Sequence, residues 1–151
     1  MMHALIHLLH EEKCSLVVAQ DIIRTFNGRG VSDLFHLLNE ESEWLRGSRV
    51  ADKIVGKGAA ALMISGGVKE VYADVISQPA LQLLHLEGIL VAYGQLVPRI
   101  INREGTGQCP LEMRLAACRT AAECLPLIRE FIEEMRLRRS QVSGLNRLSP
   151  N

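Results

Sequence analysis

The sequence predicts an α/β fold that opens with a hairpin and continues as parallel strands alternating with helices. Residues 15–19 and 22–26 are short apolar, β-branched runs around a polar Gln20-Asp21 turn, which is typical of a β-hairpin. Residues 50–92 then alternate strand, helix, strand, helix and strand, which favours parallel strands joined by right-handed crossovers. A length of 151 residues with 48% hydrophobic content fits one domain with a sizeable core.

The N-terminal elements begin with a helix predicted over residues 2–12. His3, His7 and His10 share one of its faces, which we interpret as solvated, since a metal site would need a further ligand that the sequence does not supply. After the hairpin, Ser32 is a suitable N-cap for a second helix. Residues 39–48 are predicted to form a connection that tucks Trp44 and Leu45 onto the core.

The remaining elements follow from apolar periodicity, glycines and prolines. Strands are predicted at residues 49–53, 68–73 and 89–92, with helices at 54–64, 77–87, 111–118 and about 120–138. The segment 140–151 has little to bury, so we expect a single domain over residues 1–139 and a disordered tail.

Composition excludes several classes of function. Formal net charge is zero and no long basic run occurs, so no nucleic-acid partner is expected. No apolar run is long enough for a membrane span, and the N-terminus lacks signal-peptide features, so we expect a cytoplasmic protein with free thiols. The cysteines form no CxxC pair and have no nearby histidine, so no metal or other cofactor is expected.

The first candidate site lies where the strand at 49–53 is predicted to pass into a helix. There Asp52 caps the helix or accepts hydrogen bonds from a ligand, while Lys53 binds or polarises an anion. Lys57 is four residues after Lys53 and would share a helical face with it. Gly58 allows either close approach of a ligand or close helix packing.

The second candidate site is the polar stretch 102–112. Cys109 precedes Pro110 at a predicted helix start, where the helix dipole favours a thiolate, so it is either a nucleophile or a small buried residue. Four neighbouring residues could contact a ligand: Asn102, Arg103, Gly107 and Glu112. We expect the two polar stretches to meet in space and line one pocket.

Both stretches carry a family resemblance that spans roughly residues 5–131. The chain resembles domain-of-unknown-function family 1893, a zinc-lacking branch of the cytidine deaminase-like superfamily. The resemblance lies in Ser15-Leu16-Val17-Val18, Val50-Ala51-Asp52-Lys53-Ile54-Val55-Gly56-Lys57, Gly66-Gly67-Val68-Lys69-Glu70-Val71-Tyr72-Ala73, Leu96-Val97-Pro98, Ile101-Asn102-Arg103, Gly105, Gly107 and Cys109-Pro110-Leu111-Glu112. It implies a three-layer α/β/α sandwich with a mixed sheet opened by the hairpin, and it makes a homodimer an expectation.

Deaminases of that superfamily hold zinc with an HAE-like motif at one helix start and a PCxxC motif at the next. Here the corresponding positions read Ala51-Asp52-Lys53 and Ser77-Gln78-Pro79-Ala80-Leu81, so every zinc ligand is missing. What the resemblance leaves is the pocket, which in the superfamily accepts a nucleoside or nucleotide.

Three functions remain open at this point. In the first hypothesis, the chain is a metal-independent enzyme that acts on a nucleotide-like or other small anionic substrate, with Asp52, Lys53 and Cys109 as catalytic residues. Alternatively, it is a non-catalytic ligand-binding or sensor module. A purely structural or assembly role is the third hypothesis.

Overall fold

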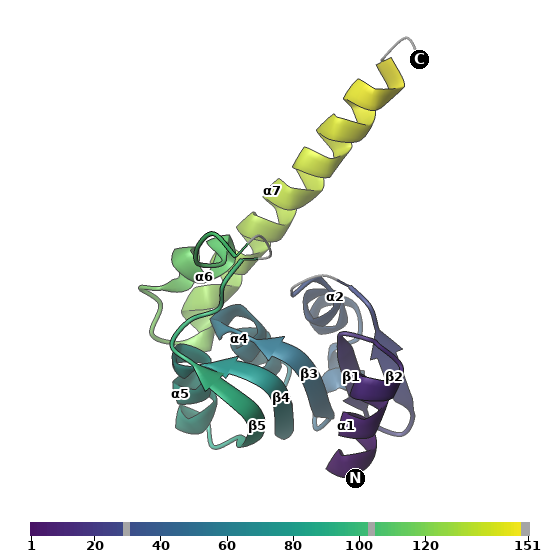
Figure 1. The fold of residues 1–151 in the computed structure, drawn as a ribbon, viewed down its shortest axis with the longest axis vertical. Helices are drawn as coiled ribbons and strands as arrows, with labels where there is room; N and C mark the ends of the chain where they lie inside the picture. Colours follow the sequence, from purple (N-terminus) through teal and green to yellow (C-terminus); the bar gives the residue numbers. More distant parts are fainter. Residues whose placement is uncertain (29–30, 103–104, 149–151) are drawn as a thin grey trace.

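The computed structural model describes residues 1–28, 31–102 and 105–148, with side chains described up to Gln141. Figure 1 shows a body built around one sheet, with the C-terminal helix extending away from it. None of the helices in the described ranges is long and apolar enough to cross a membrane.

The sheet has five strands in the order β2-β1-β3-β4-β5. β1 (Leu16–Ala19) pairs antiparallel with both β2 (Ile23–Phe26) and β3 (Arg49–Val55). β3 pairs parallel with β4 (Glu70–Ser77), which pairs parallel with β5 (Leu90–Val97). The predicted α/β fold, its hairpin and its parallel half are therefore confirmed, and the sheet is mixed.

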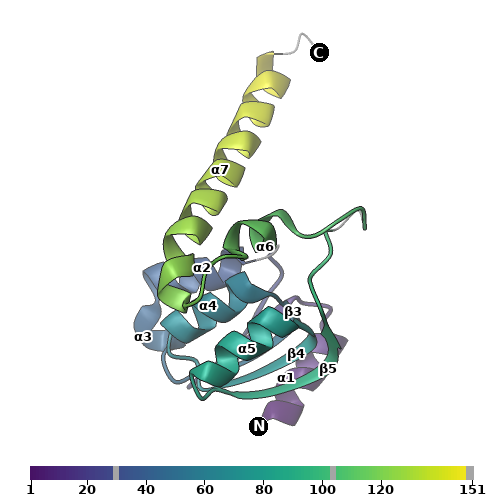
Figure 2. The same cartoon turned by 90° about the vertical axis from the view of Figure 1, so that its left-hand side faces the viewer.

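Helices cover the two faces of the sheet unequally. On one face α1 (Met2–Glu11) packs over β1 and β3, where Leu5 and Leu9 are buried against Val17 and Ala51. The opposite face carries the larger core, built with α2 (Ser32–Glu40), α4 (Lys57–Ser65), α5 (Gln78–Leu86) and α7 (Ala121–Leu148). Figures 1 and 2 show that α1 lies at the β1–β3 end of its face, away from β5.

Trp44 and Leu45 lie in a short helix, α3 (Ser42–Leu45), within the segment that the sequence predicts as a connection. Leu45 is buried in the larger core and Trp44 packs against it, as expected. The indole Nε1–H donates to Asp21 Oδ1 at 2.9 Å, which joins α3 to the hairpin turn.

The parallel strands end later than the sequence predicts. β3 continues through Ile54 and Val55 because these residues pair with Val75 and Ile76 of β4. The predicted helix at 54–64 is thus displaced, since α4 begins at Lys57 after extended backbone at Gly56. For the same reason β4 and β5 extend past the predicted 68–73 and 89–92, because pairing across the sheet holds residues that show no strand pattern of their own.

The C-terminal region folds back over the sheet through α6 (Pro110–Leu115), which Pro110 begins as predicted, and α7. The helix α7 continues to Leu148, past the predicted end near Arg138 and through most of the segment expected to be disordered. Intrahelical contacts such as the Arg136–Glu133 ion pair support helical backbone where no core is available. Residues 149–151 of that predicted tail lie outside the described residues.

Ile128 anchors α7 because its side chain is fully buried in the larger core. We expect Ile128→Ala to lower the free energy of unfolding by about 2–4 kcal/mol through lost contacts and a residual cavity. Leu137→Ala, half-exposed on the projecting part of α7, is the matched control and should change it by less than about 1 kcal/mol. Urea denaturation measures both, and equal effects would mean that α7 does not depend on this docking contact.

Candidate functional site

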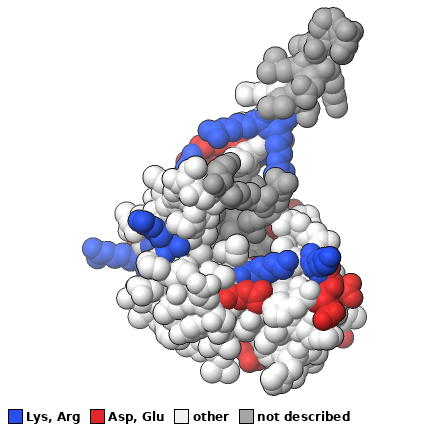
Figure 3. Space-filling view, in the orientation of Figure 1, with Lys and Arg blue, Asp and Glu red and all other residues white. Residues whose placement is uncertain are grey.

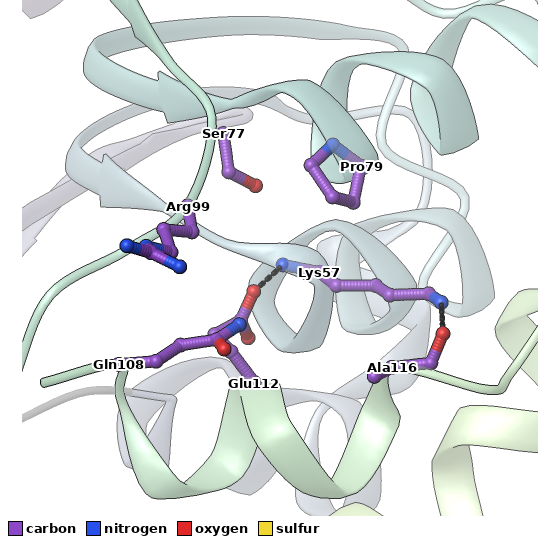
Figure 4. Close-up of a pocket in the computed structure, with 7 residues that line it drawn as sticks. All are labelled: Lys57, Ser77, Pro79, Arg99, Gln108, Glu112 and Ala116. Atoms are coloured by element: carbon purple, nitrogen blue, oxygen red, sulfur yellow. Dashed lines mark hydrogen bonds between the residues drawn. The ribbon is translucent and has the colours of Figure 1, made fainter.

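The carboxyl ends of β3, β4 and β5 meet at one edge of the sheet because these strands are parallel. Ligands bind at this edge in open α/β sheets, beside the N-termini of the helices that follow the strands. Here the chain continues from β3 into α4 and from β4 into α5, and α6 folds over the same edge (Figure 4).

A cavity of about 120 Å³ opens at this edge. Four parts of the chain line it: the helix start after β3, the helix start after β4, the segment after β5, and α6 with its flanks. The lining residues are Lys57, Ser77, Pro79, Arg99, Gln108, Glu112 and Ala116 (Figure 4). The two polar stretches of the sequence therefore do meet, through Lys57 on one side and Gln108 and Glu112 on the other.

Glu112 supplies the N-terminal cap of α4 from a distant part of the chain. Its carboxylate accepts the backbone N–H of Lys57 at 2.5 Å and that of Gly58 at 3.2 Å. The N-cap residue Gly56 has no side chain to do this, and a Cβ there would lie 2.6 Å from the carboxyl carbon of Glu112. The anion-binding position at this helix start is thus occupied by the protein's own carboxylate.

Lys57 makes the reverse contact with α6. Its ammonium group donates to the carbonyl oxygens of Leu115 at 2.8 Å and Ala116 at 3.5 Å, and also to that of Cys118. A cation at a helix C-terminus satisfies carbonyls that lack intrahelical partners. Lys57 and Glu112 are both buried. Each charged side chain binds backbone groups at the end of the helix that carries the other residue, so both residues have a structural role in this conformation.

Arg99 and Ser77 are cavity residues that the sequence analysis did not single out as ligand-binding. Ser77 caps α5, its hydroxyl oxygen accepting the Ala80 N–H at 3.2 Å, which confirms the predicted helix start. The Arg99 guanidinium has no hydrogen-bond or ion-pair partner among the described residues. Because β5 was expected to end at Ala92, nothing in the sequence placed Arg99 at the carboxyl edge.

Asp52 lies inside β3, four residues before the N-cap of α4, so it does not cap that helix. It is 9% exposed, and its Oδ1 accepts the Ile54 N–H at 3.3 Å. The pKa of Asp52 is raised to about 8, chiefly because burial disfavours the charged form. Hydrogen bonds from the backbone N–H groups of Ile54 and Lys53 lower this pKa, and the nearby carboxylates of Asp74 and Asp33 raise it. The carboxyl group is therefore mostly protonated at neutral pH.

Lys53 is also part of β3, with its backbone N–H donating to the Ser15 carbonyl at 3.1 Å. The prediction that Lys53 and Lys57 share a helical face is therefore wrong, because only Lys57 is helical. The Lys53 ammonium group has no partner among the described residues. Asp52 and Lys53 are not among the residues that line the cavity.

Cys109 is the N-cap residue of α6, half-buried and packed against the larger core. Its N–H donates to the Ile100 carbonyl at 3.0 Å and its carbonyl accepts the Met113 N–H at 3.1 Å. It adjoins the lining residue Gln108 in sequence but does not line the cavity itself. All four cysteines are free thiols, as the sequence predicts.

The loop before α6 is closed by contacts of its own. Asn102 Oδ1 accepts the Thr106 N–H at 3.0 Å, and the Asn102 N–H donates to the Gly107 carbonyl at 2.8 Å. The predicted ligand contacts Asn102 and Gly107 therefore stabilise the loop. Arg103, the third predicted contact in this loop, lies outside the described residues.

Residues 4–132 match the sequence model of a domain of unknown function, DUF1893. The chain belongs to the DUF1893 family. A solved structure of a DUF1893 family protein from Thermotoga maritima is similar in fold, with a TM-score of 0.79, 24% sequence identity, and coverage of 85% of this chain and 88% of that one. No curated protein matches. Family membership as read from the sequence is thus confirmed, and the projecting end of α7 lies beyond the matched residues.

Zinc does not fit the cavity of this DUF1893 domain. Among its lining residues the only side chain of the types that bind zinc is Glu112, which is already engaged by two backbone N–H groups. The true start of α4 reads Val55-Gly56-Lys57, so moving the helix start restores no histidine or cysteine. Over the described part of the chain, no group of three metal-binding side chains is found.

Removal of the Glu112 carboxylate should uncap α4 and release the returning segment. We expect Glu112→Ala to lower the free energy of unfolding by about 2–3 kcal/mol, because two buried N–H groups lose a charged acceptor. Glu112→Gln keeps one amide oxygen and should fall between this variant and the unmodified chain. Glu130→Ala, exposed on α7, is the control, and an effect as large as that of Glu112→Ala would rule out capping as the cause.

The buried carboxyl group of Asp52 should make stability depend on pH. The ordinary pKa of 3.8 applies to the unfolded chain and about 8 to the folded one, so the folded state retains a proton that the unfolded chain releases between these values. Stability from this group is full below pH ~4 and is lost as pH rises toward 8, by up to about 1.4 kcal/mol per pH unit.

We therefore expect Asp52→Asn to be more stable than the unmodified chain at pH 8, by on the order of 1–3 kcal/mol, with a flatter profile between pH ~5 and ~8. Chemical denaturation at several pH values measures this. The exposed control Glu43→Gln should leave the profile unchanged. Parallel profiles for Asp52→Asn and the unmodified chain would show that Asp52 titrates normally.

Proposed function

We propose that this DUF1893 domain is a ligand-binding module that holds the anionic group of a small molecule, without zinc, at the carboxyl edge of β3, β4 and β5. The observation that carries the proposal is Arg99, whose guanidinium lines a cavity in this position and has no partner among the residues that the structure describes. The N-terminus of α5 lines the same cavity through Ser77 and Pro79, and its dipole favours an anion there.

The volume of the cavity limits which ligands can enter it. A volume of about 120 Å³ is well below the roughly 300–1,000 Å³ of common small-molecule sites. It suits a phosphate or carboxylate group, with the remainder of a nucleotide or sugar phosphate outside. An uncharged nucleoside offers Arg99 no anionic group, so of the ligands that the deaminase-like resemblance suggests, the phosphorylated ones fit better.

Binding is favoured over catalysis because the two buried charged groups of the cavity, Lys57 and Glu112, already have hydrogen-bond partners in the main chain. Lys57 and Glu112 hold α4 and α6 together, and a reaction that protonated or displaced either one would disrupt that contact. This leaves Arg99 and Gln108 as side chains that could contact a ligand, a set suited to orientation rather than to proton transfer.

A metal-independent enzyme is the second candidate, and Asp52 favours it. A carboxyl group with a pKa near 8 is suited to general acid–base catalysis near neutral pH. In this proposal Asp52 positions the substrate or, in its ionised form as pH approaches 8, acts as base, while Lys53 binds the anion and Cys109 is the nucleophile. Iodoacetamide labelling tests it: a Cys109 rate that rises only around pH ~8.5, as for an ordinary thiol, would remove the nucleophile.

Calorimetric titration of the full chain with a nucleoside 5′-monophosphate, inorganic phosphate and the corresponding nucleoside tests the binding proposal. We expect the two phosphorylated probes to bind and the nucleoside not to bind. Arg99→Gln should weaken phosphate binding about tenfold or more, since a charged hydrogen bond contributes about 1.5–3 kcal/mol. Its melting temperature should stay unchanged, because Arg99 has no hydrogen-bond or ion-pair partner to lose within residues 1–28, 31–102 and 105–148.

Arg139→Gln, exposed on the projecting part of α7, removes the same charge far from the cavity and should bind as the unmodified chain does. Equal weakening by both variants would indicate non-specific attraction to positive charge. Absence of heat with every phosphorylated probe at millimolar concentration would refute the module as a phosphate binder.

A further inference from the structure

β5 is an open edge of the sheet. It is last in the strand order, and it has eight residues, which span about 26 Å at roughly 3.3 Å per residue. Its sequence, Leu90-Val91-Ala92-Tyr93-Gly94-Gln95-Leu96-Val97, has no charged residue and no proline. An exposed edge strand of this kind presents unpaired N–H and C=O groups and is a template for pairing with another strand.

The other edge of the sheet is protected. β2 has only four residues, and one of them, Arg24, stacks over the rings of Phe26 and Trp44 at 5.1 and 4.6 Å. The Arg24 guanidinium also forms an ion pair with Glu41 at 2.8 Å. A short edge strand with a fixed charge resists pairing with another strand. The two edges of this sheet therefore differ in whether a further strand can add to them.

Apolar side chains are exposed along the β5 edge and at the turn that precedes it. Leu86 is 78% exposed, Leu90 69%, Tyr93 43% and Leu96 37%. In Figure 3 the corresponding part of the surface, at the lower left over α5 and β5, is almost free of charged side chains. Side chains alternate along a strand, so Leu90 and Leu96 point to one face of the sheet and Tyr93 to the other, and apolar surface is exposed on both sides of this edge.

We propose that β5 pairs with β5 of a second copy of this chain, antiparallel about a two-fold axis, to form one continuous ten-stranded sheet. A parallel ladder treats its two strands unequally, so only the antiparallel arrangement is compatible with two-fold symmetry. An uncharged strand meets its own copy without like-charge repulsion, whereas a charged partner strand would find no complementary charge along β5.

The strand itself supports a second copy as the occupant. Pairing would satisfy the backbone edge of β5 in both copies and bring together the parts of Leu90, Tyr93 and Leu96 that face the partner strand, a contact at the small end of protein interfaces. α1 packs over β1 and β3, at the end of the sheet away from β5, so it does not lie beside this edge (Figure 1).

Sedimentation equilibrium of the full chain tests this proposal. We expect the unmodified protein to have the mass of a dimer at about 100 µM. Leu90→Lys and Tyr93→Lys each place a charge on the exposed edge and should raise the dimer dissociation constant at least about tenfold. Both positions are solvent-exposed in the single chain, so circular dichroism and melting temperature should show that the variants still fold.

Ile23→Lys is the matched control, because Ile23 is similarly exposed but lies on β2, the opposite edge. It should leave the dimer intact. A monomeric unmodified chain at the same concentration overturns the proposal. So does a dimer that survives both β5 variants, or one that dissociates with Ile23→Lys, because the contact would then lie elsewhere.

Discussion

The contact between α4 and α6 determines how the carboxyl edge of this sheet is organised. Glu112 accepts the first N–H groups of α4, and Lys57 donates to the last carbonyls of α6 and the turn that follows. Both charges bind backbone groups at helix ends, which have no hydrogen-bond partner within their own helix. Each contact therefore offsets two desolvation costs, that of the buried charge and that of the buried backbone groups. Neither charge can move without leaving the other helix end unsatisfied.

That contact also positions the rest of the cavity. It holds the segment carrying Gln108 across the ends of the parallel strands, opposite Ser77 and Arg99. Lys57 and Glu112, from the two polar stretches, are therefore used to hold α4 and α6 together, and the charged lining residue outside this contact is Arg99, which follows β5. Asp52 belongs to a different environment, within the sheet, where burial rather than a helix terminus controls its protonation.

Much of the fold could be predicted because it depends on local signals. Alternating apolar runs and a polar turn identified the hairpin, and Ser77 with Pro79 identified the start of α5. The ends of β3 and β5 could not be found this way, because Ile54, Val55 and the residues after Ala92 are held in strands by pairing with β4. This error moved the start of α4 and so assigned Lys53 to a helix.

The sequence by itself determined the fold class, the family and the meeting of two polar stretches at one edge. Periodicity, turn residues and motif spacing are properties of neighbouring residues, so they can be read without the structure. Only the tertiary structure decided which charges are free. Whether Lys57 binds a ligand or caps a helix depends on carbonyls 58 to 61 residues away, and the contrast between the β2 and β5 edges depends on strand order. Such long-range partners leave no periodic signal, because they are set by how the elements pack and not by their own composition.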